Sequence, residues 1–84
     1  MSIEETLRER HKTHGEFKYQ AVISQHLKKT IHYYEGHKEL DPDQLEALEM
    51  IAHKIARILN GNANEFDHWH DIAGYATLVA ERLK

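Results

Sequence analysis

The segment 43–80 carries two strongly periodic apolar patterns that are separated by one glycine, and this feature constrains the fold most. Before Gly61 the apolar residues recur at the three- and four-residue spacing of a helix face, and this spacing resumes after Asn64. A connector this short favours two helices that pack antiparallel as a hairpin. No segment of the chain has the alternating pattern of a strand. The sequence therefore predicts an all-α fold.

Start and stop residues predict four helices. Asp41 before Pro42 is typical of a helix start. Gly15 can take a left-handed turn between the first two helices. Residues 35–39 indicate a polar loop, and Asn64 is the expected N-cap of the last helix. The predicted helices cover residues 3–12, 17–34, 42–60 and 65–83. Together they give one domain (1–84), a small bundle of three to four helices with a C-terminal antiparallel hairpin.

Length and composition narrow the classes of protein. A chain of 84 residues buries only about 60–65% of its unfolded surface, so its core is thin. The chain has no cysteine, which leaves neither a disulfide nor a thiolate metal site. We therefore expect a homodimer that completes the core. The net charge of −3 argues against nucleic-acid binding, and the polar N-terminus and short apolar runs predict a cytoplasmic protein without a membrane span.

Charged residues accompany the apolar stripes of the last two helices at helical spacing. The row on the third helix consists of Glu46, Glu49, His53 and Arg57, with Lys54 adjacent. The row on the fourth consists of Asp67, Asp71 and Tyr75. Because residues three or four apart share a helix face, the two rows can approach each other in a hairpin. Their oxygen donors favour Mg²⁺ or Mn²⁺ beside Glu49 and Asp71, and Lys54 and Arg57 can bind phosphate.

Three stretches of the chain resemble a group of small phage and prophage proteins of uncharacterised function. They are ERHKTHGEF, EALEMIAHKIARILNG and DHWHDIAGYATLV. In that group an MIAHKIARI helix is followed by an HW-x-DIAGYA helix. Together the three stretches cover nearly half of the chain. The resemblance implies a phage or prophage origin and supplies no activity.

A second resemblance is to the all-α nucleotide pyrophosphatases of the MazG and dimeric dUTPase kind. Their E-x-x-E motif matches Glu46 and Glu49, and their E-x-x-D motif matches Asp71, with His68 in place of its glutamate. The resemblance implies a Mg²⁺-bound nucleoside triphosphate, with metal ligands at Glu46, Glu49, His68 and Asp71. It also implies a metal-activated water that releases pyrophosphate, with Glu46 or His53 as general base.

Two function classes remain open, and with them the question of whether the chain is an enzyme. The first is a metal-dependent nucleotide-binding or pyrophosphohydrolase-like protein. The second is a non-enzymatic module that binds a host or phage protein, in which Asp71 pairs with Lys54 or Arg57 and fixes the hairpin register. Carboxylates that converge in a cleft would indicate the first class. An exposed apolar patch without such convergence would indicate the second.

The sequence also supports expectations about one glycine and one polar segment. Gly74 lies in the middle of the fourth helix at a cost of about 1 kcal/mol relative to alanine, which indicates close approach by a helix of this chain or of a partner. The polar KTHGEF segment around His11 and His14 predicts a turn between two helices. The alternative is a loop that closes over the mouth of a site on the hairpin.

Overall fold

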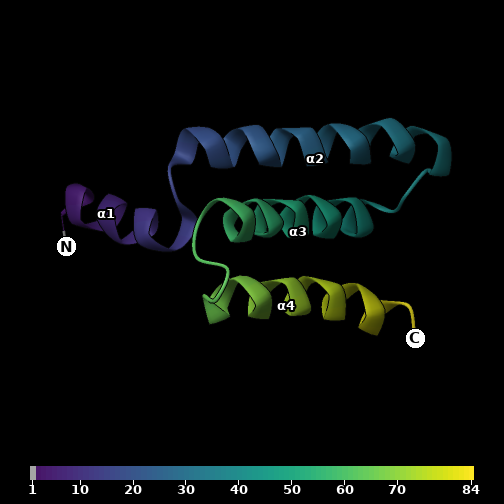
Figure 1. Cartoon of the computed structure of the whole chain (residues 1–84). Coiled ribbons are helices and arrows are strands. Elements are labelled where there is room, and N and C mark those ends of the chain that lie inside the picture. Colours follow the sequence, from purple (N-terminus) through teal and green to yellow (C-terminus); the bar gives the residue numbers. More distant parts are fainter. Residues whose placement is uncertain (1) are drawn as a thin grey trace.

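The computed structural model describes residues 2–84 apart from the side chain of Lys38, and this part of the chain forms helices joined by short connectors (Figure 1). The helices are α1 (Ile3–His14), α2 (Phe17–Lys38), α3 (Pro42–Asn60) and α4 (Phe66–Arg82). α3 lies between α2 and α4 and packs against both, and α1 extends beyond one end of this three-helix layer (Figure 1). The predicted all-α fold with a C-terminal antiparallel hairpin is confirmed.

Most of the predicted helix boundaries agree with the structure. Gly15 takes a positive φ of 76°, as its place in a turn predicts. α3 begins at Pro42, and the backbone N–H of Asp41 donates to Oε1 of Gln44 at 2.9 Å. The predicted loop at 35–39 is wrong, because α2 continues to Lys38. Glutamate, histidine and lysine are compatible with a helix, so one glycine among them does not end it.

The N-cap predicted for the fourth helix is also wrong. The backbone N–H of Asn64 donates to Oδ1 of Asn62 at 2.9 Å, so Asn64 belongs to the turn that connects α3 to α4. Glu65 takes the N-cap position one residue later. No helix in the described part of the chain combines the length and apolar character that a membrane span requires.

The helices of the layer meet through small and polar side chains. The buried residues are Ala47, Ala52 and Ala56, with Gln20, Ser24, Lys54 and His68. No large side chain is fully buried in the described part. Because α2 and α4 contact α3 from opposite sides, two faces of α3 remain open (Figure 1). This arrangement explains why so many large apolar side chains stay exposed.

The two open faces of the layer differ in character. A groove between α3 and α4 on one face is lined by Leu40, Gln44, Ala47, Leu48, Ile51, Ala76 and Val79. The groove on the other face is lined by Asp43, Glu46, Ala47, Tyr75, Leu78, Val79 and Arg82. With 3.6 residues per turn, His53 and Arg57 share the second face with Glu46. We call these surfaces the apolar face and the charged face.

At one end of the layer the α1–α2 and α3–α4 connectors cross backbone to backbone. A Cβ atom added at Gly61 would collide with the carbonyl oxygen of Thr13 and with the backbone of His14. A Cβ atom added at Gly15 would collide with the backbone carbonyl of Asn60. Both glycines are therefore required by close approach, and Gly15 also by its positive φ.

Hydrogen bonds fix this crossing, which we call the glycine junction. The side-chain amide of Asn60 donates to the carbonyl oxygens of His14 at 3.0 Å and Glu16 at 2.8 Å. The backbone N–H of Asn62 donates to the carbonyl oxygen of Thr13 at 2.9 Å. The junction thus holds the end of α1 against the hairpin, although α1 itself has no buried residue.

The opposite end of the hairpin is held by an ion-pair cluster. The Arg82 guanidinium near the end of α4 donates to Asp43 in the first turn of α3 and to Asp41, its N-cap. These bonds hold the pKa of the Asp43 carboxyl below its usual range. The hairpin is therefore anchored at both ends, by backbone contact at one and by charge at the other.

Two glycine substitutions test the importance of the junction. Gly61→Ala should lower the free energy of unfolding by about 1–3 kcal/mol, because the new methyl group meets backbone that cannot easily move. Gly74→Ala should raise it by about 0.5–1 kcal/mol, because no atom lies within 4 Å of the added methyl group. The open space also means that no described helix of this chain approaches Gly74, so of the two expectations from the sequence only approach by a partner stays a prediction. Urea unfolding followed by circular dichroism measures the free energy of unfolding of both variants. Equal changes in Gly61→Ala and Gly74→Ala would contradict a special role of the junction.

Candidate functional site

Two clefts open beside the glycine junction. The α1-side cleft, of about 290 Å³, is lined by Leu7, Arg10, His11, His14, Gly15, Phe17, Gln20, His53 and Arg57. The α4-side cleft, of about 220 Å³, is lined by Thr13, His14, Lys54, Arg57, Glu65, Asp67, His68 and Asp71. His14 and Arg57 line both clefts, so these two side chains separate one cleft from the other.

Arg57 carries the least compensated charge of the site. Its Nε atom is buried and has no hydrogen-bond partner, and within residues 2–84 its guanidinium makes no ion pair. Burial and the nearby Arg10 lower the pKa of Arg57, although Asp71 and Tyr75 act in the opposite direction. A buried donor without an acceptor costs about 1–3 kcal/mol. An anion in either cleft would lie next to the guanidinium and offset its charge.

His14 is held neutral by the same surroundings. Burial, followed by Arg57, His68, Lys54 and Arg10, lowers the pKa of His14 to about 4. The His14 and His68 rings lie 5.2 Å apart. His68 is buried, and its Nε2 lies 2.8 Å from the carbonyl oxygen of Thr13, so Nε2 carries the proton. The fourth helix is thereby tied to the glycine junction through His68.

His53 also occupies the α1-side cleft as a neutral ring. Burial, followed by Arg57, Lys28 and Lys54, lowers its pKa. The side-chain amide of Gln20 donates to Nε2 of His53 at 3.3 Å, which requires this ring nitrogen to be unprotonated. The nitrogen that a general base would use is therefore already engaged with Gln20. The catalytic role of His53 stays a prediction.

Two of the predicted metal ligands contact basic side chains in different directions. Glu49 points toward α2, and its carboxylate lies 3.1 Å from Nε2 of His32. Asp71 lies 2.9 Å from Nζ of the buried Lys54, and this contact holds the pKa of the Asp71 carboxyl below its usual range. The Asp71–Lys54 pair is the structural alternative that the sequence left open. The charge of Lys54, a predicted phosphate ligand, is thus partly offset.

Glu46 and His68, the other two predicted metal ligands, have different neighbours from each other. Glu46 is exposed on the charged face beside Tyr75, and His68 is bonded to the junction. Across the residues that the structure describes, no three histidine or acidic side chains are grouped as metal ligands would be. The Mg²⁺ or Mn²⁺ site at these four residues stays a prediction, as does the catalytic role of Glu46.

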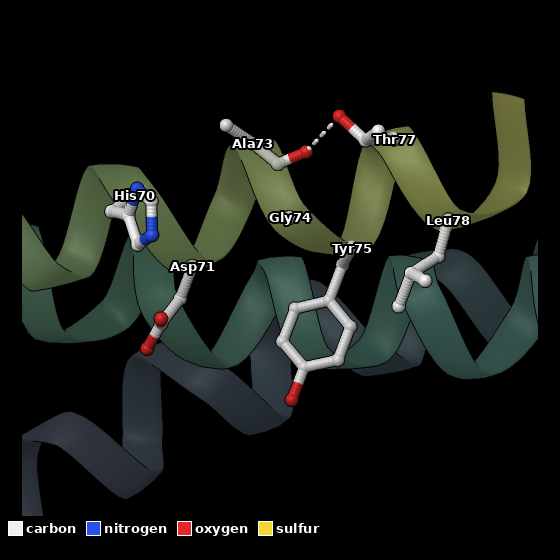
Figure 2. Close-up of a pocket in the computed structure, with 7 residues that line it drawn as sticks. All are labelled: His70, Asp71, Ala73, Gly74, Tyr75, Thr77 and Leu78. Atoms are coloured by element: carbon white, nitrogen blue, oxygen red, sulfur yellow. Dashed lines mark hydrogen bonds between the residues drawn. The ribbon is translucent and has the colours of Figure 1, made fainter. Parts of the chain in front are cut away.

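A hollow of about 550 Å³ runs along the outer side of α4 (Figure 2). Its lining consists of His70, Asp71, Ala73, Gly74, Tyr75, Thr77 and Leu78. Figure 2 shows Asp71, Tyr75 and Leu78 projecting from one edge of the helix, while the Thr77 hydroxyl donates to the carbonyl oxygen of Ala73 at 2.7 Å. Every lining residue belongs to α4, so this surface lacks the second wall that a small-molecule site needs.

A model of the family described as a domain of unknown function (DUF6378) matches residues 3–83, nearly the whole chain. The chain belongs to this family. The family description assigns no activity, so the site must be judged on its chemistry. No curated protein and no solved structure matches the chain.

Sequence reasoning found part of the site in this DUF6378 protein. It singled out Arg57 and Lys54 for phosphate, and the structure places both in the α4-side cleft. It connected His14 and Phe17 with a site on the hairpin only in the alternative of a KTHGEF loop over the mouth of that site, and it did not include Arg10. The available signal was the polar KTHGEF segment, in which α1 continues to His14 and only Gly15 and Glu16 form the turn before α2. The turn also lies against the end of the hairpin, so His14 reaches both clefts.

The depressed pKa of His14 predicts how stability depends on pH. An unfolded chain protonates this histidine near pH 6.5, whereas the folded chain does so only near pH 4. Because the unfolded state binds more protons in this window, the free energy of unfolding should fall as the pH is lowered from about 6.5 to about 4. His53 contributes in the same direction.

Urea unfolding at several pH values measures this dependence. In His14→Gln the decline should be shallower than in the native chain, because one of the groups that drive it is gone. The matched control is His26→Gln, which replaces an exposed histidine of α2 outside both clefts. A decline equally steep in His14→Gln and in His26→Gln would contradict the assignment.

Proposed function

We propose that this protein binds a phosphorylated small molecule of the nucleotide class, with its phosphates on Arg57. The observation that carries the proposal is the buried guanidinium nitrogen of Arg57, which has no acceptor within the described residues and lies between two clefts. A guanidinium presents a planar fork of donors that matches phosphate oxygens. A phosphate bound in a cleft that Arg57 lines would neutralise the charge of this guanidinium.

Local charge supports an anionic ligand, although the whole chain has a net charge of −3. Arg57, Lys54 and Arg10 each lower the pKa of His14, which indicates a positive potential at the junction. Lys54 is compensated by Asp71, whereas Arg10 and Arg57 form no ion pair among residues 2–84. The excess positive charge therefore lies on the side of the α1-side cleft, where both arginines contribute to the lining.

The walls of the α1-side cleft support a ligand with an aromatic part. Leu7 and Phe17 line it beside the two arginines, and the Phe17 side chain is exposed. A nucleobase can stack on an aromatic ring while its phosphates reach a cation. Inorganic phosphate would contact the arginines alone. The combination of an exposed aromatic ring with two arginines therefore favours a nucleotide over a simple anion.

Hydrolysis of a nucleoside triphosphate is the finer form of this proposal. It takes Glu46, Glu49, His68 and Asp71 as ligands of Mg²⁺ or Mn²⁺, and its support is the sequence resemblance to the nucleotide pyrophosphatases. For a cation to use both Glu49 and Asp71, the pairs Glu49–His32 and Asp71–Lys54 would have to open. The sequence resemblance also supports a phage or prophage origin.

A second candidate function is a module that binds a host or phage protein. Its support is the apolar face, where Leu48 and Leu59 of α3 are exposed. This face lies on the other side of the layer from Arg57. The two functions therefore use different surfaces and can be tested separately.

Titration with inorganic pyrophosphate and with a nucleoside triphosphate, followed calorimetrically with and without Mg²⁺, tests the proposal. Arg57→Ala should weaken the binding of both ligands about 10-fold or more, because a charge-assisted hydrogen bond contributes about 1.5–3 kcal/mol. Phe17→Ala should weaken the binding of the nucleoside triphosphate but not of pyrophosphate, because pyrophosphate has no base to stack on the ring.

The matched control is Arg8→Ala, which removes an exposed arginine of α1 that lines neither cleft. This variant should bind both ligands within about twofold of the native chain, because a single exposed charge is screened by salt. Absence of pyrophosphate binding, or equal losses in Arg57→Ala and Arg8→Ala, would contradict the proposal.

A further inference from the structure

We propose that a second copy of this chain packs on the apolar face of the layer, and that two such layers form the complete core. The inference concerns the surface opposite the cationic clefts. It does not depend on what the clefts bind.

Helix geometry places a continuous apolar surface on one side of α3. With 3.6 residues per turn, Leu48, Ile55 and Leu59 lie within a narrow arc that is roughly opposite to Arg57. The groove between α3 and α4 on this side contains Leu48 and Val79, and no charged residue lines it. The same surface continues across two helices, so it offers an extended patch.

The α2 helix extends this surface on the other side of α3. Buried Ser24 marks the side of α2 that packs on α3, and His32 reaches Glu49 from the charged side. Helical spacing places Ile23 and Leu27 on the opposite side of that contact. All three helices of the layer therefore contribute apolar side chains to one face.

The exposed area of the chain is too large for a compact monomer of its mass. The accessible surface is 6242 Å², whereas a compact protein of 9.9 kDa has about 5,200 Å². The radius of gyration is 14.3 Å, against about 12 Å for a compact chain of 84 residues. The excess, on the order of 1,000 Å², is close to the ~800 Å² that each partner buries in a standard interface.

Charge selects the second copy as the occupant and the apolar face as the contact. A two-fold dimer places the same patch of both subunits against itself. The groove on the apolar face has no charged lining residue, so two copies meet there without like-charge repulsion. On the charged face, a second copy would take Glu46 and Arg57 out of water, which carries a desolvation cost that the apolar face does not have.

Two leucines with similar exposure but on different faces provide the test. Leu59 is 67% exposed and belongs to the apolar face, and Leu78 is 70% exposed and lines the groove on the charged face. Figure 2 shows Leu78 on the same edge of α4 as Asp71 and Tyr75. Because both side chains are exposed in one copy, glutamate at either position is compatible with the fold of that copy.

Analytical ultracentrifugation of the full chain over a wide concentration range measures the dimer. The native chain and Leu78→Glu should be dimeric, whereas Leu59→Glu should raise the dimer Kd on the order of 100-fold, because each subunit buries one charge. Leu48→Glu should act in the same direction, and it keeps the test valid if Leu59→Glu loses its helical circular dichroism. A monomeric native chain would overturn the proposal. The proposal would also be overturned if Leu78→Glu were monomeric while Leu59→Glu stayed dimeric.

Discussion

The backbone crossing of the two glycine-bearing connectors is the contact on which the rest of the structure depends. Thr13 at the end of α1 accepts hydrogen bonds from Asn62 and from the buried His68, so two separate elements are tied to one carbonyl group. α1 buries no side chain of its own and is held to the layer mainly at this end. Loss of the close approach at Gly61 would therefore release α1 and, with it, one wall of the candidate site.

The same crossing concentrates positive charge in a small volume. It brings the end of α1 against the last turns of α3, where burial and the nearby Arg57 and Lys54 lower the pKa of His14 to about 4. Asp71 compensates Lys54, and the described residues supply no acceptor for the buried Nε of Arg57. A protein that keeps such a donor unpaired next to two clefts is suited to receive an anion there.

Local sequence signals were sufficient for the four helices, apart from the end of α2 and the N-cap of α4, and for much of the charged face. The periodicity of α3 and α4, the Asp41–Pro42 start and the turn at Gly15 all agree with the structure. The directions of individual side chains could not be deduced in the same way. Glu49 faces α2 because α3 is the middle helix of a layer, and this arrangement depends on how three helices pack. The close approach at Gly61 likewise involves residues far apart in sequence.

The architecture separates two surfaces with different chemistry, a charged face that ends in the cationic clefts and an apolar face without charge along its groove. We propose that an anion binds beside Arg57 and His14. The most direct test is the pKa of His14, measured by nuclear magnetic resonance in the free protein and with saturating pyrophosphate. We predict that the value rises from about 4 by about one pH unit or more, because the ligand offsets the neighbouring cations. A His14 pKa that stays near 4 while pyrophosphate is bound would contradict an anion site beside His14.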